Sequence, residues 1–109
     1  MTRYGMVLGV KPEDEARYKE YHVAVWPDVL AMIRQCNIRN YSIYLKEPEN
    51  LMFAYFEYHG TDYEADMAAM AADAKTQEWW SIMIPMQTPW GTRKDGEWWA
   101  SMEEVFHME

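Results

Sequence analysis

The chain has 109 residues, half of them hydrophobic and 16% aromatic, and it carries a formal net charge of −8 at pH 7. This length suits one domain over residues 1–109 with a modest core. A strongly acidic chain lacks the basic surface that phosphate groups require, so we expect neither nucleic acid nor an anionic membrane surface as a partner.

Cysteine usage and the N-terminus indicate the compartment. The single cysteine, Cys36, cannot form an internal disulfide, which fits a reducing environment. The N-terminal residues lack the apolar run of a signal peptide, and no segment approaches the ~20 apolar residues that span a bilayer. We therefore expect a soluble, cytoplasmic protein.

The N-terminal third predicts a strand followed by a long helix. Residues 4–10 alternate between apolar side chains on one face and a glycine-rich opposite face, over which either a helix packs closely or a cavity opens. Pro12 and the acidic residues after it are typical of a helix start, and the helical pattern extends to about Gln35. Pro27 removes a backbone donor inside that pattern, so we expect a kink or break there.

The middle of the chain predicts a β-hairpin. Residues 40–45 and 51–58 have the composition of strands, and Pro48 lies in the short loop between them. Both faces of the second strand are apolar or aromatic, so both sides of the sheet should be covered. One face can take the helices, but so short a chain cannot easily supply a layer for the other.

The C-terminal half predicts two helices, a loop and a strand. Thr61 opens a capping-box pattern at the start of one helix, and Thr76 is placed to cap the next, which Pro85 ends. Residues 88–100 form a loop that contains three tryptophans, and residues 103–108 predict a last strand.

This order of elements is that of a ferredoxin-like βαββαβ sandwich, an α+β fold with two layers. The uncovered apolar face of its sheet predicts a homodimer in which two sheets meet face to face. No internal repeat or linker indicates a second domain.

Tyr18, His22 and Trp26 are spaced by four residues, so they share one face of the predicted helix. A free imidazole titrates at about pH 6.5, so it can give or take a proton near neutral pH. His22 is therefore the acid/base candidate. The alternative is a core histidine hydrogen-bonded to the backbone or to Tyr18. Tyr18 and Tyr41 likewise either offer hydroxyls to a polar ligand or are ordinary half-buried aromatic residues.

Trp79 and Trp80 are adjacent in a predicted helix and point about 100° apart, so both cannot serve one core stripe. One is expected to pack inward and the other to form a flat wall of the kind that binds the C–H faces of sugars. The alternative is a core residue beside a dimer contact. Glu57 is either a second acid/base group with a raised pKa or, as we favour, a residue at a wet strand edge.

No motif for a nucleotide or metal cofactor is present. The chain has no glycine-rich phosphate loop, no Cys-x-x-Cys and no His-Glu-x-x-His, and its three histidines lack metal-ligand spacing. We therefore expect no cofactor and no metal.

Four blocks of sequence, in order along the chain, resemble the L-rhamnose mutarotase family. They are Tyr18-x-x-x-His22-x-x-x-Trp26-Pro27, Asn40-Tyr41-Ser42-Ile43-Tyr44-Leu45, Trp79-Trp80-x-x-Met83 and Glu103-x-Val105-Phe106-His107. This resemblance implies a ferredoxin-like dimeric α/β barrel that interconverts the α and β anomers of a free sugar, L-rhamnose or a relative, without a cofactor. It also implies that His22 is the proton donor and that the sugar is bound by Tyr18, Tyr41, Trp79 and Trp80.

The loop at residues 88–100 departs from the family, which often has a short Asn/Asp/Pro-rich loop there. If the loop borders the pocket, it can change the preferred sugar and leave the chemistry unaltered. Two other classes of function stay open. One is a cofactor-free or haem-degrading monooxygenase of the same dimeric barrel plan, and the other is a non-catalytic sugar-binding dimer.

Overall fold

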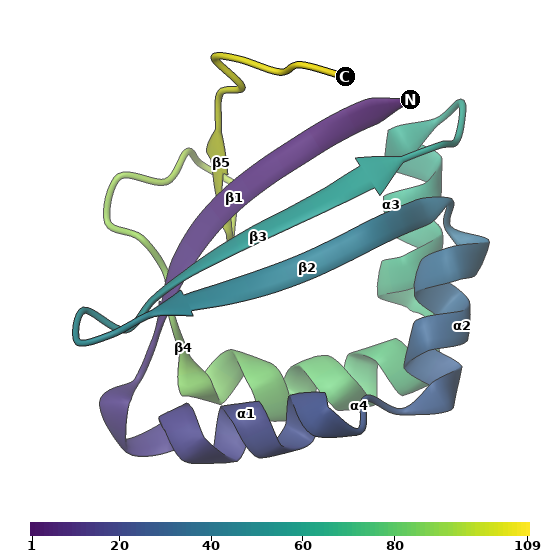
Figure 1. Cartoon of the computed structure of the whole chain (residues 1–109). Coiled ribbons are helices and arrows are strands. Elements are labelled where there is room, and N and C mark those ends of the chain that lie inside the picture. The colour runs from purple at the N-terminus through teal and green to yellow at the C-terminus, as the bar shows by residue number, and fades with distance from the viewer.

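The computed structural model describes all of residues 1–109 and has an α+β architecture, with four helices beside a curled antiparallel sheet (Figure 1). The strands lie in the order β2-β3-β1-β4, and β5 pairs with the same edge of β1 as β4. Their bounds are Thr2–Val10 for β1, Ile38–Lys46 for β2, Leu51–Tyr58 for β3, Gln87–Thr88 for β4 and Ala100–Met102 for β5. The predicted βαββαβ order is therefore present, with two helices in each helical connection.

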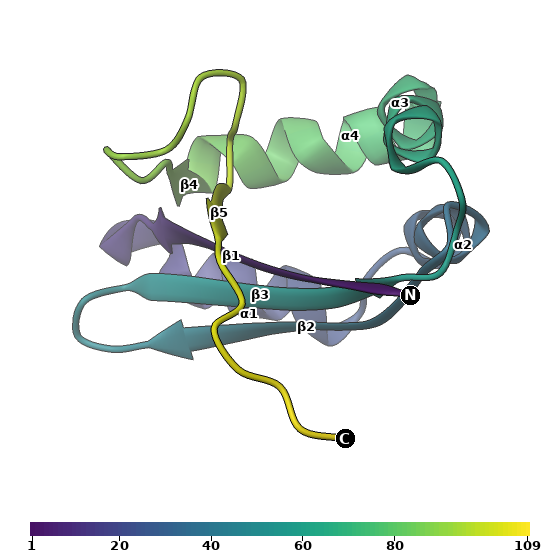
Figure 2. The ribbon, with the colours of Figure 1, turned by 90° about the horizontal axis from the view of Figure 1, so that it is seen from above.

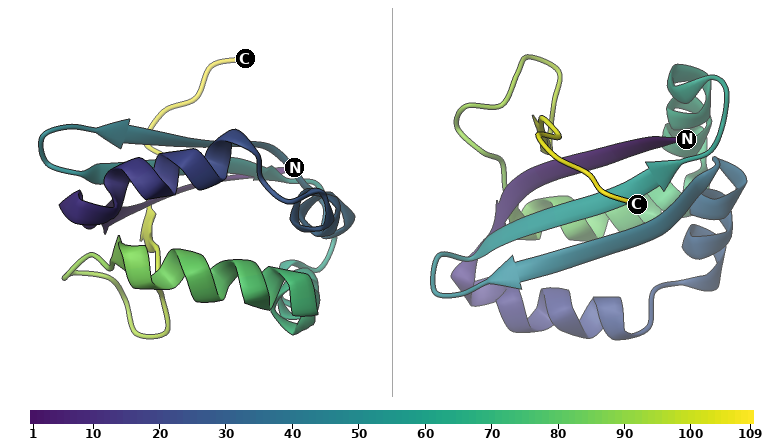
Figure 3. Two further views of the ribbon diagram at one scale, coloured as in Figure 1. Left: turned by 90° about the horizontal axis from the view of Figure 1, so that it is seen from below. Right: turned by 45° about the horizontal axis from the view of Figure 1, so that its top comes forward.

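The first helical connection breaks where Pro27 was expected to interrupt it. It comprises the short 3₁₀ helix η1 (Pro12–Asp14), α1 (Glu15–Val23) and α2 (Pro27–Gln35). The Trp26 carbonyl accepts hydrogen bonds from the amides of Val29 and Leu30, which starts the second helix. The break lets α1 and α2 take different directions along the sheet (Figures 1 and 3).

The second helical connection comprises α3 (Tyr63–Ala72), α4 (Ala74–Met83) and the 3₁₀ turn η2 (Ile84–Met86). Both predicted caps were wrong, because an aspartate caps each helix. Asp62 accepts from the amide of Ala65, and Asp73 accepts from the amide of Thr76. A carboxylate is both an acceptor and a negative charge at the positive end of the helix dipole, which favours it over a threonine hydroxyl.

The predicted last strand at residues 103–108 was also wrong. Pairing with β1 ends at Met102, and the residues beyond it form no regular element. The Arg3 guanidinium instead binds both carboxylate oxygens of Glu104, at 2.9 and 3.0 Å. Side chains rather than ladder hydrogen bonds thus hold the start of the C-terminal segment, which extends on the side of the sheet away from the helices (Figure 2).

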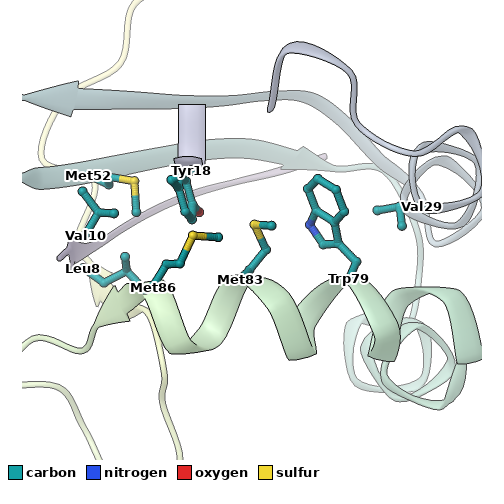
Figure 4. Close-up of a cluster of buried hydrophobic side chains, with 8 residues drawn as sticks. All are labelled: Leu8, Val10, Tyr18, Val29, Met52, Trp79, Met83 and Met86. Atoms are coloured by element: carbon teal, nitrogen blue, oxygen red, sulfur yellow. The ribbon is translucent and has the colours of Figure 1, made fainter. Parts of the chain in front are cut away.

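The main core lies between the sheet and helices α1, α2 and α4 (Figure 4). Its buried side chains are Leu8, Val10, Tyr18, Val29, Met52, Trp79, Met83 and Met86. The sequence predicted a helix or a cavity over the glycines of β1 on the opposite face, and this prediction was wrong for Gly5. Instead the ring of Phe53 packs over Gly5, where an added Cβ would meet it at 3.3 Å. None of the helices has the length and hydropathy needed to cross a bilayer.

Candidate active site

A cavity of about 390 Å³ opens between the sheet and helices α1, α2 and α4. This volume falls in the range of small-molecule sites. Most of its lining is hydrophobic, and its polar residues include His22, Tyr18 and Tyr41. The cavity therefore has the features expected of a small-molecule site, an apolar body with a few convergent polar groups.

Local helix geometry places Tyr18 and His22 together on α1. They are one turn apart, and their rings stack with centroids 4.4 Å apart and planes inclined by 24°. His22 Nδ1 lies 2.7 Å from the carbonyl oxygen of Tyr18. A carbonyl can only accept, so Nδ1 carries the proton and Nε2 makes no hydrogen bond within the protein. The backbone bond that we considered as an alternative role for His22 is thus present, and it leaves one ring nitrogen free for chemistry.

A β-bulge in β2 turns Tyr41 toward the same cavity. The register with β3 shifts between Arg39 and Ser42, so that β2 holds one extra residue there. One extra residue changes the phase of the strand's two-residue alternation. Ile38 before the bulge and Ile43 after it consequently both face the helices, although their numbers differ by an odd count. Tyr41 lies within the bulge, with its ring 5.4 Å from that of Phe56.

Both phenols in the cavity are held in the neutral form. Desolvation raises the pKa of Tyr18, and the hydrogen bond from Gln87 offsets this only in part. Desolvation also raises the pKa of Tyr41, although 41% of that residue is exposed. Both hydroxyls therefore retain their protons at neutral pH and act as hydrogen-bond donors and acceptors rather than as phenolates.

The two adjacent tryptophans have different surroundings. Trp79 is buried, projects from α4 toward the sheet and lines the cavity (Figure 4). Its indole meets the ring of His22 edge to face, with centroids 5.5 Å apart, and that of Trp26 at 5.1 Å. Trp80 is half-buried and packs against the core without lining the cavity. The structure thus brings together Tyr18, His22, Tyr41 and Trp79, and leaves Trp80 outside this group.

Helix α1 also places two charged side chains at the cavity that the sequence analysis did not identify as site residues. Glu15 and Lys19 line the cavity and form an ion pair at 3.0 Å, and Lys19 also reaches Glu47 at 3.1 Å. Asn50 donates to Glu15 at 2.9 Å. The spacing of Glu15, Lys19 and His22 on one helical face was the signal that could have identified them.

Gln87 is a second residue that no sequence pattern indicated. It is buried in β4, and its Nε2 donates to the hydroxyl of Tyr18 at 3.1 Å. Its Oε1 accepts from the indole N–H of Trp98 at 2.7 Å. The tryptophan-rich loop therefore reaches the cavity wall through Gln87 rather than by lining the cavity.

Glu57 lies outside the cavity, but the wet-edge interpretation was wrong in its place, because β3 is an interior strand and Glu57 is paired with both β1 and β2. Hydrogen bonds from Asn40, His59 and Tyr55 lower its pKa, which is opposite to the shift that an acid catalyst would need. No three His, Cys, Asp or Glu side chains are grouped in a way that could hold a metal ion.

Fold and cavity together define a small α+β protein with an aromatic-walled small-molecule site that contains an imidazole. Comparison with known proteins identifies the family. The family model described as L-rhamnose mutarotase matches residues 3–108. The chain therefore belongs to the L-rhamnose mutarotase family, and it is expected to be an isomerase of sugar metabolism.

Individual relatives agree over their full length. An L-rhamnose mutarotase of Oceanobacillus iheyensis is 30% identical over 109 residues, and one of Yersinia pestis is 28% identical, with 100% of both chains covered in each case. The crystal structure of an L-rhamnose mutarotase from Formosa agariphila superimposes with a TM-score of 0.79 at 23% identity over 100% of both chains. Tetracenomycin F2 cyclase from Streptomyces glaucescens shares the fold at a TM-score of 0.73 and 15% identity, covering 100% of this chain and 98% of its own.

Proposed function

We propose that this protein is a mutarotase that interconverts the α and β anomers of L-rhamnose or a related 6-deoxy sugar. Family membership supports the class of reaction. The observation that carries the proposal is the state of His22, whose Nδ1 is engaged by the Tyr18 carbonyl while Nε2 is free and the residue lines the cavity.

Mutarotation opens the hemiacetal ring and recloses it on the other face of the carbonyl. In opening, the anomeric hydroxyl loses its proton, the bond from C1 to the ring oxygen breaks, and the ring oxygen gains a proton. His22 in its doubly protonated form donates that proton from Nε2 and recovers it on reclosure. Desolvation raises the pKa of Tyr41, so its phenol keeps its own proton and cannot serve as the base. A water held by Tyr41 therefore accepts the anomeric proton.

The other walls match a 6-deoxy sugar. The indole of Trp79 offers an apolar face to the ring C–H groups, and the hydroxyls of Tyr18 and Tyr41 offer hydrogen bonds to sugar oxygens. A 6-deoxy sugar carries a methyl group in place of one hydroxyl, and the aliphatic lining at Ile43 and Leu45 suits that group. Trp80, which packs against the core without lining the cavity, is not given a direct contact with the sugar in this proposal.

Saturation-transfer NMR on an equilibrated sugar tests the proposal, because it measures anomer exchange directly. His22→Ala should lower the enzyme-dependent exchange rate about 10²- to 10⁴-fold, the usual contribution of a positioned acid or base. His59→Ala is the matched control, since His59 binds Glu57 away from the cavity and its loss should leave exchange unchanged. Unchanged exchange in His22→Ala would remove His22 from the mechanism.

Two further measurements separate the other functional classes. Sugar-dependent quenching of tryptophan fluorescence with exchange no faster than buffer would identify a non-catalytic sugar-binding protein. A sharp Soret shift at one equivalent of haemin would favour a haem-degrading monooxygenase.

We also propose that the protein forms a homodimer in which two ferredoxin-like domains pair their sheets into a dimeric α/β barrel. The side of the sheet away from the helices exposes Tyr44 and Met102, and the C-terminal segment beyond it exposes Phe106 at 78%. Exposed large apolar side chains of this kind are typical of an interface. Light scattering should give twice the 13.0 kDa chain mass, and Phe106→Asp should shift the protein toward the monomer.

A further inference from the structure

We propose that Gln87 is a positioning residue that aims the hydroxyl proton of Tyr18 into the cavity, and that Trp98 holds Gln87 in the orientation this requires. The inference rests on the proposed function for its catalytic consequence, but the hydrogen bonds that carry it are independent of any reaction.

The orientation of Gln87 follows from the chemistry of the indole. An indole nitrogen is only a donor, so the atom of Gln87 that lies 2.7 Å from Trp98 Nε1 must be the acceptor Oε1. An amide has one acceptor side and one donor side. Its Nε2 therefore faces the other way, toward the hydroxyl of Tyr18 at 3.1 Å.

The orientation of Tyr18 follows in turn. Since Nε2 of Gln87 can only donate, the Tyr18 oxygen must accept, and its own proton cannot lie on the line to Gln87. Gln87 and Tyr18 are 7% and 6% exposed, so bulk water has little access with which to reorient the pair. No other protein group accepts from Tyr18, and the residue lines the cavity. The proton is thus left for an oxygen of the bound molecule.

This arrangement makes Tyr18 a fixed donor rather than an adaptable hydroxyl. A fixed donor binds a sugar oxygen that presents a lone pair to it. It discriminates against a sugar whose hydroxyl must donate its own proton to Tyr18. Trp98 belongs to the loop between β4 and β5, at residues 89–99. The loop therefore acts on the sugar through the direction of one proton rather than by direct contact.

The decisive variant is Gln87→Glu, which keeps the shape and reverses the polarity. As a carboxylate, Glu would accept from both Trp98 and Tyr18 and draw the tyrosine proton away from the cavity. When protonated, it can again accept from Trp98 and donate to Tyr18, which restores the original arrangement. The ratio of variant to wild-type anomer exchange should fall about 10-fold at about pH 8 and recover as the pH is lowered toward about 5.

A ratio that stays flat with pH overturns the proposal, because a residue with a merely structural role would lower exchange equally at every pH. Trp98→Phe guards against a misfolded Gln87→Glu protein, since it alters a loop residue that is 37% exposed. Without the indole N–H the amide of Gln87 can rotate, and exchange should fall about 3- to 10-fold. Trp90→Phe is the control in the same loop, because Trp90 donates no hydrogen bond from its ring. Equal exchange in the two tryptophan variants overturns the role of Trp98.

An NMR measurement keeps this inference separate from the proposed function. The indole N–H of Trp98 should exchange with solvent more slowly than that of Trp90, and Gln87→Leu should remove the difference. Wild-type protein without anomer exchange toward any sugar would overturn the mutarotase function alone. Equal solvent exchange at Trp98 and Trp90 would overturn the hydrogen-bond chain, whatever the activity.

Discussion

Replacing Asp73 with alanine should destabilise the helix that carries Trp79. The Asp73 carboxylate caps α4 by accepting from the amide of Thr76 at 3.0 Å, and it accepts from the Thr76 hydroxyl at 2.9 Å. Thr76 is only 1% exposed. The variant therefore removes a helix cap and leaves a hydroxyl without a partner inside the protein.

These two losses set the magnitude. A missing aspartate cap costs about 1 kcal/mol, and a buried polar group left unpaired costs about 1–3 kcal/mol. The free energy of unfolding should fall by about 2–4 kcal/mol, which lowers Tm by roughly 8–16 °C in a domain of this size. Urea unfolding followed by circular dichroism measures the free energy of unfolding, and a thermal melt followed in the same way measures Tm.

A second variant isolates the hydroxyl. In Asp73→Ala/Thr76→Val the unpaired hydroxyl is replaced by a methyl group, so the double variant should be more stable than Asp73→Ala by about 1–3 kcal/mol. Asp62→Ala is the matched control, because Asp62 caps α3 through the amide of Ala65 and holds no buried hydroxyl. It should lose only about 1 kcal/mol. If Asp62→Ala and Asp73→Ala are equally destabilised, or the double variant gains nothing, the reasoning is wrong.

Three further predictions concern the turn after β3 and the cavity. The Tyr58 hydroxyl donates to Asp66 and lowers its pKa, so the stability that Asp66 contributes is complete above the usual carboxyl pKa of about 3.9 and is lost as the pH falls through the lowered value. Tyr58→Phe should flatten this acid-side slope, as urea midpoints between about pH 2 and 5 would show. Gly60→Ala should lower Tm, because its Cβ would clash with the Tyr58 hydroxyl, whereas Gly91→Ala, with no atom within 4 Å, should not; equal Tm values would contradict this. Ile43→Trp should fill the cavity and abolish sugar-dependent fluorescence quenching while the circular dichroism spectrum is retained; undiminished quenching would place the sugar elsewhere.

Local features of the sequence predicted most of the fold and half of the site. The alternation of residues 51–58 placed Met52, Phe56 and Tyr58 on one face, and all three are buried there. The four-residue spacing of Tyr18 and His22 placed their rings together, and the rings stack. Each of these outcomes depends only on the repeat of a single helix or strand, which is a property of neighbouring residues.

Other parts of the site depend on contacts between distant segments. Tyr41 reaches the cavity because a bulge changes the phase of β2, and the register with β3 sets where that bulge occurs. Gln87 meets Tyr18 across 69 positions of the chain, and Trp98 meets Gln87 only after the loop has folded back. The residues next to Gln87, Met86 and Thr88, carry no local sign of such a partner.

The sequence by itself determined the periodic elements, the break at Pro27 and the face that Tyr18 and His22 share, since backbone geometry alone relates residues a few positions apart. The tertiary structure decided which groups complete the cavity and which way the Tyr18 hydroxyl faces. Those choices depend on strand register and on the pairing of buried donors with acceptors, and both are settled only when the whole sheet and its helices pack together.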